Sequence, residues 1–129
     1  MKTMDRFLAS YIETALWSST DEDGTPLDDS EYADTEIAEE SLKEMQADCI
    51  RFEAEAQRLF DAFNSASDDY PIHITGYHVA HDFWLTRNRH GAGFWDGDYP
   101  KPLGEQLTDL AHTFGESDLY VGDDGKFYL

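Results

Sequence analysis

The chain has 129 residues and a formal net charge of −19, because 28 acidic side chains face only nine Lys and Arg. Such a field repels nucleic acid and anionic membranes and attracts basic protein surfaces, so direct binding to DNA, RNA or lipid is not expected. Hydrophobic residues still make up 40% of the sequence, enough for a folded domain in place of a disordered chain. Cys49 has no cysteine partner, and no run approaches the roughly 18 apolar residues of a membrane span, which favours a cytoplasmic protein.

Two helices are predicted in the first half of the chain. Apolar residues recur every three or four positions over residues 4–17, as on a helix with one buried face. Residues 18–30 are rich in Ser, Asp, Gly and Pro and predict an exposed acidic loop. A second helix is expected to begin at a cap formed by Asp34 or Thr35 and to run to about Asn64.

A turn is expected at residues 65–71, after which the pattern favours extended structure. Residues 72–77 are predicted to form a short strand. Residues 82–87 and 93–96 fit two strands, joined by a loop at 88–92 whose residues tolerate positive φ. The sequence therefore predicts a β-hairpin in this region.

A third helix is predicted over residues 103–114, because its apolar positions have helical spacing and Gly115 follows as a typical C-terminal residue. Residues 119–121 and 126–129 flank a Gly-Asp-Asp-Gly turn, and the Asp-Gly step favours a tight reversal. The chain is therefore expected to end in a second hairpin.

Together these elements predict an α+β fold, in which N-terminal helices pack on a small antiparallel sheet of hairpins with one further helix. We expect a single domain over residues 1–129. It would consist of a helical acidic half, residues 1–66, and a second half of hairpin, helix and hairpin, residues 71–129. No internal repeat is visible in the sequence.

Four stretches of the chain are distinctive in their wording: HDFWLTRNRHGAG at 81–93, FWDGDY at 94–99, DLYVGDDG at 118–125 and FLASYIETALWSSTDEDGTPLDD at 7–29. They resemble a family of small acidic proteins encoded by phages and prophages. The resemblance implies a viral or mobile-element origin and a location in the host cytoplasm. Because members of that family are mostly uncharacterised, it carries over no catalytic residue. Phages maintain small acidic proteins that block host defences, including DNA mimics, so an antirestriction or anti-CRISPR role is an expectation by analogy.

Carboxylates are concentrated between residues 21 and 40, where ten occur without a single Lys or Arg. Neighbouring carboxylates on one helix face lie about 5–6 Å apart, close to the spacing of phosphates along a DNA strand. This pattern predicts a protein without enzymatic activity or cofactor that binds the basic surface of a host nucleic-acid-handling protein. The expected partner-binding residues are Asp21, Glu22, Asp23, Asp28, Asp29, Glu31, Glu36, Glu39, Glu40, Glu44 and Asp48.

The acidity of the chain is also consistent with roles unrelated to partner binding. A solvated acidic face can simply keep the protein soluble. Adaptation to a high-salt cytoplasm and a role in virion assembly are further alternatives, and the sequence leaves the oligomeric state open.

The main basic cluster suggests a different function, that of a small ligand- or metal-binding protein or enzyme. It lies on the predicted hairpin loop, where arginine forks and neighbouring glycines suit a phosphate; its arginines can instead pair with Asp82 or Asp96. The residues of this alternative ligand site are Arg87, Arg89, His90, Trp84 and Trp95. No metal site is predicted, because the spacing of the nearby candidates matches no established motif; these are His78, His81, Asp82, His90 and Asp96.

Overall fold

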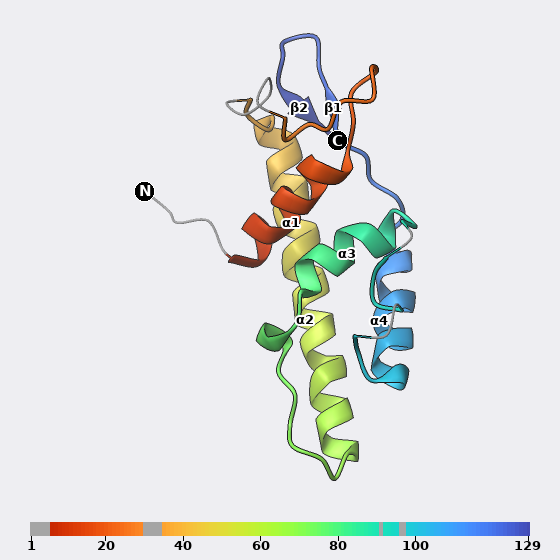
Figure 1. The fold of residues 1–129 in the computed structure, drawn as a ribbon. Helices are drawn as coiled ribbons and strands as arrows, with labels where there is room; N and C mark the ends of the chain where they lie inside the picture. Colours follow the sequence, from red (N-terminus) through yellow and green to blue (C-terminus); the bar gives the residue numbers. More distant parts are fainter. Residues whose placement is uncertain (1–5, 30–34, 91, 96–97) are drawn as a thin grey trace.

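The computed structural model describes residues 6–29, 35–90, 92–95 and 98–129. Within these ranges the chain is mostly helical, with a two-stranded antiparallel sheet at one end (Figure 1). The elements in chain order are α1 (Arg6–Ser18), α2 (Glu39–Ala66), the 3₁₀ turn η2 (Ile74–Gly76), α3 (Val79–Arg87), α4 (Lys101–Thr113), β1 (Tyr120–Val121) and β2 (Phe127–Tyr128). The α+β class is confirmed in its broad form, although the sheet is far smaller than expected.

The long helix α2 extends along the whole molecule and packs against α1 and α4 (Figure 1). One side of the helix is buried along Met45, Cys49, Phe52, Ala56 and Phe60, but its predicted start is wrong. The helix begins at Glu39 after Ala38, and no side chain caps it; Thr35 precedes the helix and Asp34 lies outside the described residues. The chain enters α2 from an extended segment, because the Ala38 amide donates to the Phe127 carbonyl at 2.8 Å.

The first helix and the loop after it agree with the sequence pattern. Residues 6–18 form α1, while residues 4 and 5 of the predicted helix lie outside the described ranges. Tyr11 packs α1 against α3, with its ring centre 5.2 Å from that of Phe83 and 5.3 Å from that of Trp84. The acidic loop is mostly exposed, but Leu27 within it is fully buried.

The predicted hairpin at 82–96 is wrong in the part that the structure describes. Residues 79–87 form α3, and all of them except His81 are buried. A helix buried around its circumference has apolar residues at consecutive positions, so its sequence carries no helical period and resembles a buried strand. Residues 93–95 form no strand either, because Gly93 lies against Thr86 and the Phe94 amide donates to the Thr86 hydroxyl at 3.2 Å.

The predicted strand at 72–77 is also wrong. The side chain of Asn64, near the end of α2, donates to the Ile72 carbonyl at 2.8 Å and accepts from the Ile72 amide at 3.0 Å. Both backbone groups of Ile72 are thus satisfied by one amide, so this segment needs no strand partner. The chain then turns through η2 into α3.

The last helix and the closing hairpin are confirmed. α4 begins at Lys101 after Pro100, slightly earlier than predicted, and is followed by Gly115 with a φ of 75°. The strands pair Tyr120 with Tyr128 and Val121 with Phe127. The hairpin is held at one end of the molecule by an isolated parallel bridge between Ile37 and Phe127 (Figure 1), so the expected packing of helices on a sheet is wrong: the helices pack on one another.

Both halves of the chain contribute to one hydrophobic core. At its centre the rings of Phe52 from α2 and Phe83 from α3 stack with centroids 3.9 Å apart. Large aromatic side chains bury the most apolar area per residue and therefore dominate the energetics of such a core. Among the described residues, no helix combines the length and apolar character that crossing a bilayer requires.

Candidate functional site

The acidic loop after α1 has a defined conformation. The Asp21 carboxylate accepts hydrogen bonds from the amides of Asp23 and Thr25, each at 2.9 Å, and the Leu27 amide donates to the Ser19 carbonyl at 3.0 Å. Asp21 therefore shapes the loop from within, as Asp commonly does in tight turns. The other carboxylates of the loop that were expected to bind a partner are exposed: Glu22, Asp23, Asp28 and Asp29.

The carboxylates around the start of α2 are exposed as well. A helix that began at the predicted cap would hold Glu36 in its first turn. Glu36 instead lies in the extended segment before α2, where its carbonyl accepts from the Phe127 amide at 2.9 Å. Glu39, Glu40 and Glu44 lie on the solvent side of the helix. Glu39 pairs with Lys43 at 3.3 Å, and since both side chains are highly exposed this pair neutralises little of the field. Glu31 lies outside the described residues.

The closing hairpin adds two carboxylates that sequence reasoning missed. Asp123 and Asp124 are exposed in its turn. One side of the hairpin faces the acidic loop across a hollow of about 500 Å³, and the other side faces the start of α2 across a hollow of about 410 Å³. This adjacency depends on the bridge from β2 to Ile37, for which the sequence carries no local signal.

These three segments lie at the same end of the molecule in Figure 1, where the hairpin, the loop after α1 and the first turn of α2 meet. We refer to their carboxylates as the acidic end. The hollow beside α2 is lined by Lys43 and Lys126 as well as by Glu39 and Glu40, so the two charges balance within it. Over the acidic end as a whole, the carboxylates outnumber these two cations. The acidic end comprises Asp21, Glu22, Asp23, Asp28, Asp29, Glu36, Glu39, Glu40, Glu44, Asp123 and Asp124.

Asp48 does not belong to this exposed set, which corrects its assignment as a partner-binding residue. Its carboxylate lies 2.8 Å from the Arg87 guanidinium, and its side chain is only 23% exposed. Because Arg87 already occupies this carboxylate, Asp48 has a structural role within the fold.

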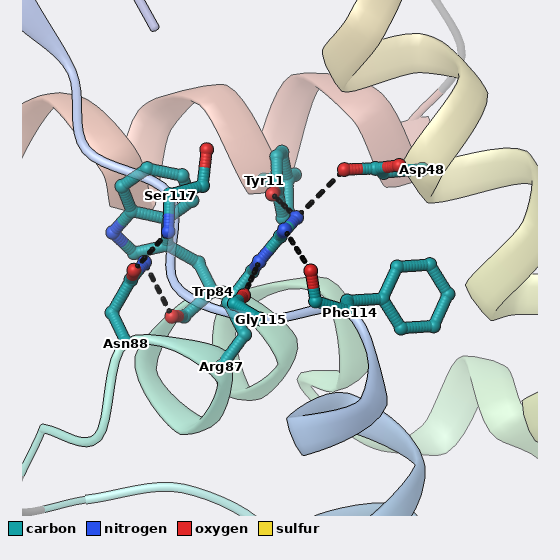
Figure 2. A network of polar contacts seen from close by, with 8 residues as sticks. All are labelled: Tyr11, Asp48, Trp84, Arg87, Asn88, Phe114, Gly115 and Ser117. Carbon is teal, nitrogen blue, oxygen red and sulfur yellow. Dashed lines mark hydrogen bonds and ion pairs between the residues drawn. The ribbon is translucent and has the colours of Figure 1, made fainter.

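Arg87 is buried at the end of α3 and not on a loop, which overturns the ligand site proposed around it. Its side chain is 4% exposed. The guanidinium donates to the Tyr11 hydroxyl at 2.9 Å, to Asp48 at 2.8 Å, and to the carbonyls of Phe114 and Gly115 at 3.0 and 2.8 Å (Figure 2). We call these five residues the arginine centre. It joins α1, α2, α3 and the end of α4, where a cation is favoured by the free carbonyls of the helix terminus.

The electrostatics of the arginine centre keep Arg87 charged. Burial alone lowers the pKa of Arg87, but its contacts with Tyr11 and Asp48 outweigh burial and raise that pKa. Burial raises the pKa of the Tyr11 phenol, even though the nearby guanidinium opposes this effect. The centre therefore has a fixed pattern of one cation, one anion and neutral acceptors.

The remaining members of the proposed ligand site are not brought together around Arg87. Trp84 is 1% exposed and donates from its indole to the Ser18 hydroxyl at 2.8 Å, so it belongs to the core. Arg89, His90 and Trp95 are exposed. Nearby, Asn88 donates to the Trp84 carbonyl and accepts from the Ser117 amide (Figure 2), which fixes the chain after α3.

The residues considered as metal ligands in the sequence do not come together as one metal site in the described part of the chain. Asp82 is buried and accepts from the Tyr99 hydroxyl at 2.7 Å, and burial followed by this bond raises the pKa of Tyr99. Asp96 lies outside the described residues, within which no group of three or more His, Cys, Asp or Glu could hold a metal ion. His78 and His81 do lie together, with ring centroids 6.5 Å apart.

Comparison with known proteins identifies no relative of this chain. No family model matches it, and no curated protein or solved structure matches it significantly. The surface chemistry of the acidic end is therefore the basis for assigning a function.

Proposed function

We propose that this chain is a non-enzymatic binding protein whose acidic end occupies a basic surface on a nucleic-acid-handling protein. The observation that supports this best is the position of the exposed carboxylates. Segments far apart in the sequence, namely the loop after α1, the start of α2 and the closing hairpin, contribute them to one end of the molecule. A concentrated patch of one charge attracts a complementary surface more strongly than the same charge spread evenly.

Partner binding by this end would work through occlusion. Exposed carboxylates can neutralise the Lys and Arg side chains that otherwise hold phosphates, so nucleic acid and this protein would compete for one surface. Such binding weakens steeply with salt, because the Debye length falls to about 8 Å at physiological ionic strength.

The resemblance to phage and prophage proteins suggests the class of partner. A protein of that origin would act in the host cytoplasm on a basic host protein, and restriction or CRISPR machinery fits both the origin and the charge. This part of the proposal is an analogy from origin; the acidic end itself favours only a basic, phosphate-binding surface.

The experiment is affinity capture with defined variants. Bacterial lysate is passed over the immobilised protein at low salt and eluted with a salt gradient, and the eluted proteins are identified by mass spectrometry. We expect a basic nucleic-acid-binding protein that is released at moderate salt and is displaced by added DNA. Neutralising Glu36, Glu39, Glu40 and Glu44 together, each to Gln, should shift its elution to clearly lower salt.

A matched variant removes the same number of charges elsewhere. Asp68, Asp69, Glu105 and Asp109 are exposed and lie outside the acidic end, and their replacement by Asn or Gln should leave the elution position nearly unchanged. Equal shifts for both variants would mean that net charge alone causes retention, and the proposal would then be wrong.

A further inference from the structure

His81 on α3 makes a polar contact with α1 that determines which of its ring nitrogens carries the proton in the neutral imidazole. Its Nδ1 lies 3.0 Å from the Thr14 hydroxyl, which in turn lies 2.9 Å from the Ser10 carbonyl. Thr14 is 2% exposed, so these two contacts account for most of the surroundings of its hydroxyl. The hydroxyl has one proton, and both contacts are hydrogen bonds only if it donates to Ser10 and accepts from Nδ1–H of His81.

This arrangement leaves the Nε2 lone pair of neutral His81 available to a ligand. A hydrogen bond from one ring nitrogen to a fixed acceptor is how proteins orient a histidine whose other nitrogen binds a metal ion. The Trp17 ring also stacks on His81, with centroids 5.6 Å apart and planes inclined by 30°, which restrains the orientation of the imidazole.

His78 supplies a second imidazole beside the first. It is exposed and lies with His81 along two hollows of about 420 and 340 Å³, the larger of which is also lined by Glu13. Ion–nitrogen distances of about 2.0–2.1 Å would place two bound imidazole centres roughly 5–6 Å apart. The present separation of 6.5 Å lies just above this range, and the exposed position of His78 allows its side chain to turn.

We propose that His78 and His81 form an open two-imidazole site for a divalent first-row transition ion of the Zn²⁺ and Cu²⁺ class. Imidazole favours these ions over Mg²⁺ or Ca²⁺, which prefer oxygen ligands. Among the described residues, no group of three or more His, Cys, Asp or Glu could hold a metal ion, so solvent would fill the other positions and the ion would exchange readily. Thr14 is the positioning residue. The site is independent of the acidic end and of the function proposed for it.

The test is a titration with Zn²⁺, followed by ¹⁵N resonances of the histidine rings in the folded protein. Excess Mg²⁺ is present throughout, so that the carboxylates of the acidic end are already occupied by a cation. Without Zn²⁺, neutral His81 should carry its proton on Nδ1. Addition of Zn²⁺ should shift Nε2 of His81 and one ring nitrogen of His78 together, along a single binding curve.

Variants separate positioning from direct binding. His81→Ala and His78→Ala should each weaken Zn²⁺ binding at least tenfold, whereas His73→Ala, at an exposed position outside both hollows, should not. Thr14→Val should move the proton of His81 toward Nε2 and weaken binding severalfold, while Thr14→Ser, which keeps the hydroxyl, should preserve both properties.

Two results would overturn the proposal. One is a His81 ring protonated on Nε2 in the wild-type protein without Zn²⁺. The other is Zn²⁺ binding that is equally strong in His81→Ala and wild type. If Thr14→Val fails to fold, the ring ¹⁵N pattern of wild type and the His81→Ala comparison still decide the matter.

Discussion

The acidic end and the arginine centre differ in how their charges are surrounded: by solvent at the acidic end and by protein at the arginine centre. At the acidic end many carboxylates face solvent and share few cations. At the arginine centre a single guanidinium, 4% exposed, is matched by four acceptors from three other parts of the chain. Among the described residues, no buried side-chain nitrogen or oxygen lacks a hydrogen-bond partner.

The difference shows how burial determines what a charge does. A buried charge without partners is costly, and the buried guanidinium of Arg87 has four hydrogen bonds from its surroundings. An exposed charge remains hydrated, contributes little to folding and stays available to a partner. Substitutions at the two places should therefore affect different properties, namely stability at the arginine centre and association at the acidic end.

The largest effect is expected from Arg87→Met. This change leaves Asp48, the Tyr11 hydroxyl and two carbonyls without their donor, and removal of one member of a buried ion pair costs about 3–5 kcal/mol. The free energy of unfolding from urea titration measures the loss. Arg58→Met removes an exposed pair with Glu55, at 3.5 Å, and should cost less than about 0.5 kcal/mol.

If Arg87→Met does not fold, a milder substitution still allows the free energy of unfolding to be measured. Asp48→Asn retains an acceptor for Arg87 and removes only the charge, so a loss of about 1–2 kcal/mol is expected. A loss no greater than that of Arg58→Met would show that Arg87 is not a buried link between the helices.

Gly104→Ala should be the next largest change, and it tests the tight packing around the same helices. Alanine favours a helix over glycine by about 1 kcal/mol. However, a Cβ at position 104 would lie 2.7 Å from the Phe94 carbonyl oxygen, which is backbone and cannot easily move. Overpacking costs about 1–3 kcal/mol, so we expect a net loss of stability in urea. Gln106→Ala, at an exposed position of the same helix, should not destabilise the protein.

At the acidic end the expected effect on stability is smaller and has the opposite sign. Replacing Glu36, Glu39, Glu40 and Glu44 by Gln relieves repulsion and should raise the free energy of unfolding by about 1 kcal/mol or less at low salt. The gain should disappear on addition of salt, because the Debye length falls from about 30 Å at 0.01 M to about 10 Å at 0.1 M. The measurement is the thermal melting of this variant between 0.01 M and 0.1 M salt. The control is the variant with the same number of neutral substitutions, at Asp68, Asp69, Glu105 and Asp109. A large loss of stability would show that these glutamates support the fold.

The elements that sequence reasoning recovered are those with one buried face or a turn signal. α1, α2 and α4 show apolar residues at helical spacing, and the closing hairpin has a Gly-Asp-Asp-Gly turn. α3 was missed because its sides are almost all buried, which removes the alternation that distinguishes a helix from a strand. The hydrophobic run Phe83-Trp84-Leu85 fits either structure, and only the surrounding helices decide between them.

The site could be predicted only where it depends on composition. Exposure of the acidic loop and of Glu36, Glu39, Glu40 and Glu44 follows from the density of charge. The burial of Arg87 could not be foreseen, because its ion-pair partner Asp48 is 39 positions away and no local pattern connects them. The same limit applies to Asp123 and Asp124, which join the acidic end through pairing between distant segments.

The smallest effect concerns the hydrogen bond within the closing hairpin. The Tyr128 hydroxyl donates to Asp124 at 2.6 Å. This bond raises the pKa of Tyr128 to about 12, from an ordinary value of about 10, and lowers the pKa of Asp124. The folded state thus holds the Tyr128 proton more tightly than the unfolded chain does. The stability linked to Tyr128 is complete below pH 10 or so and is lost as the pH rises through about 12.

For Asp124 the sign is reversed. Its folded-state pKa is depressed, so its contribution is present above the ordinary carboxyl pKa and is lost as the pH falls through the lowered value. Tyr128→Phe should therefore return the Asp124 pKa, followed by NMR, toward its ordinary value and remove a tyrosinate transition near pH 12. Tyr120→Phe keeps the ring that stacks on Tyr128 and should change neither. The bond lies in solvent at the acidic end. If Tyr128→Phe leaves the Asp124 pKa unchanged, Tyr128 does not engage the Asp124 carboxylate, which is then as available to a basic partner as the neighbouring carboxylates are.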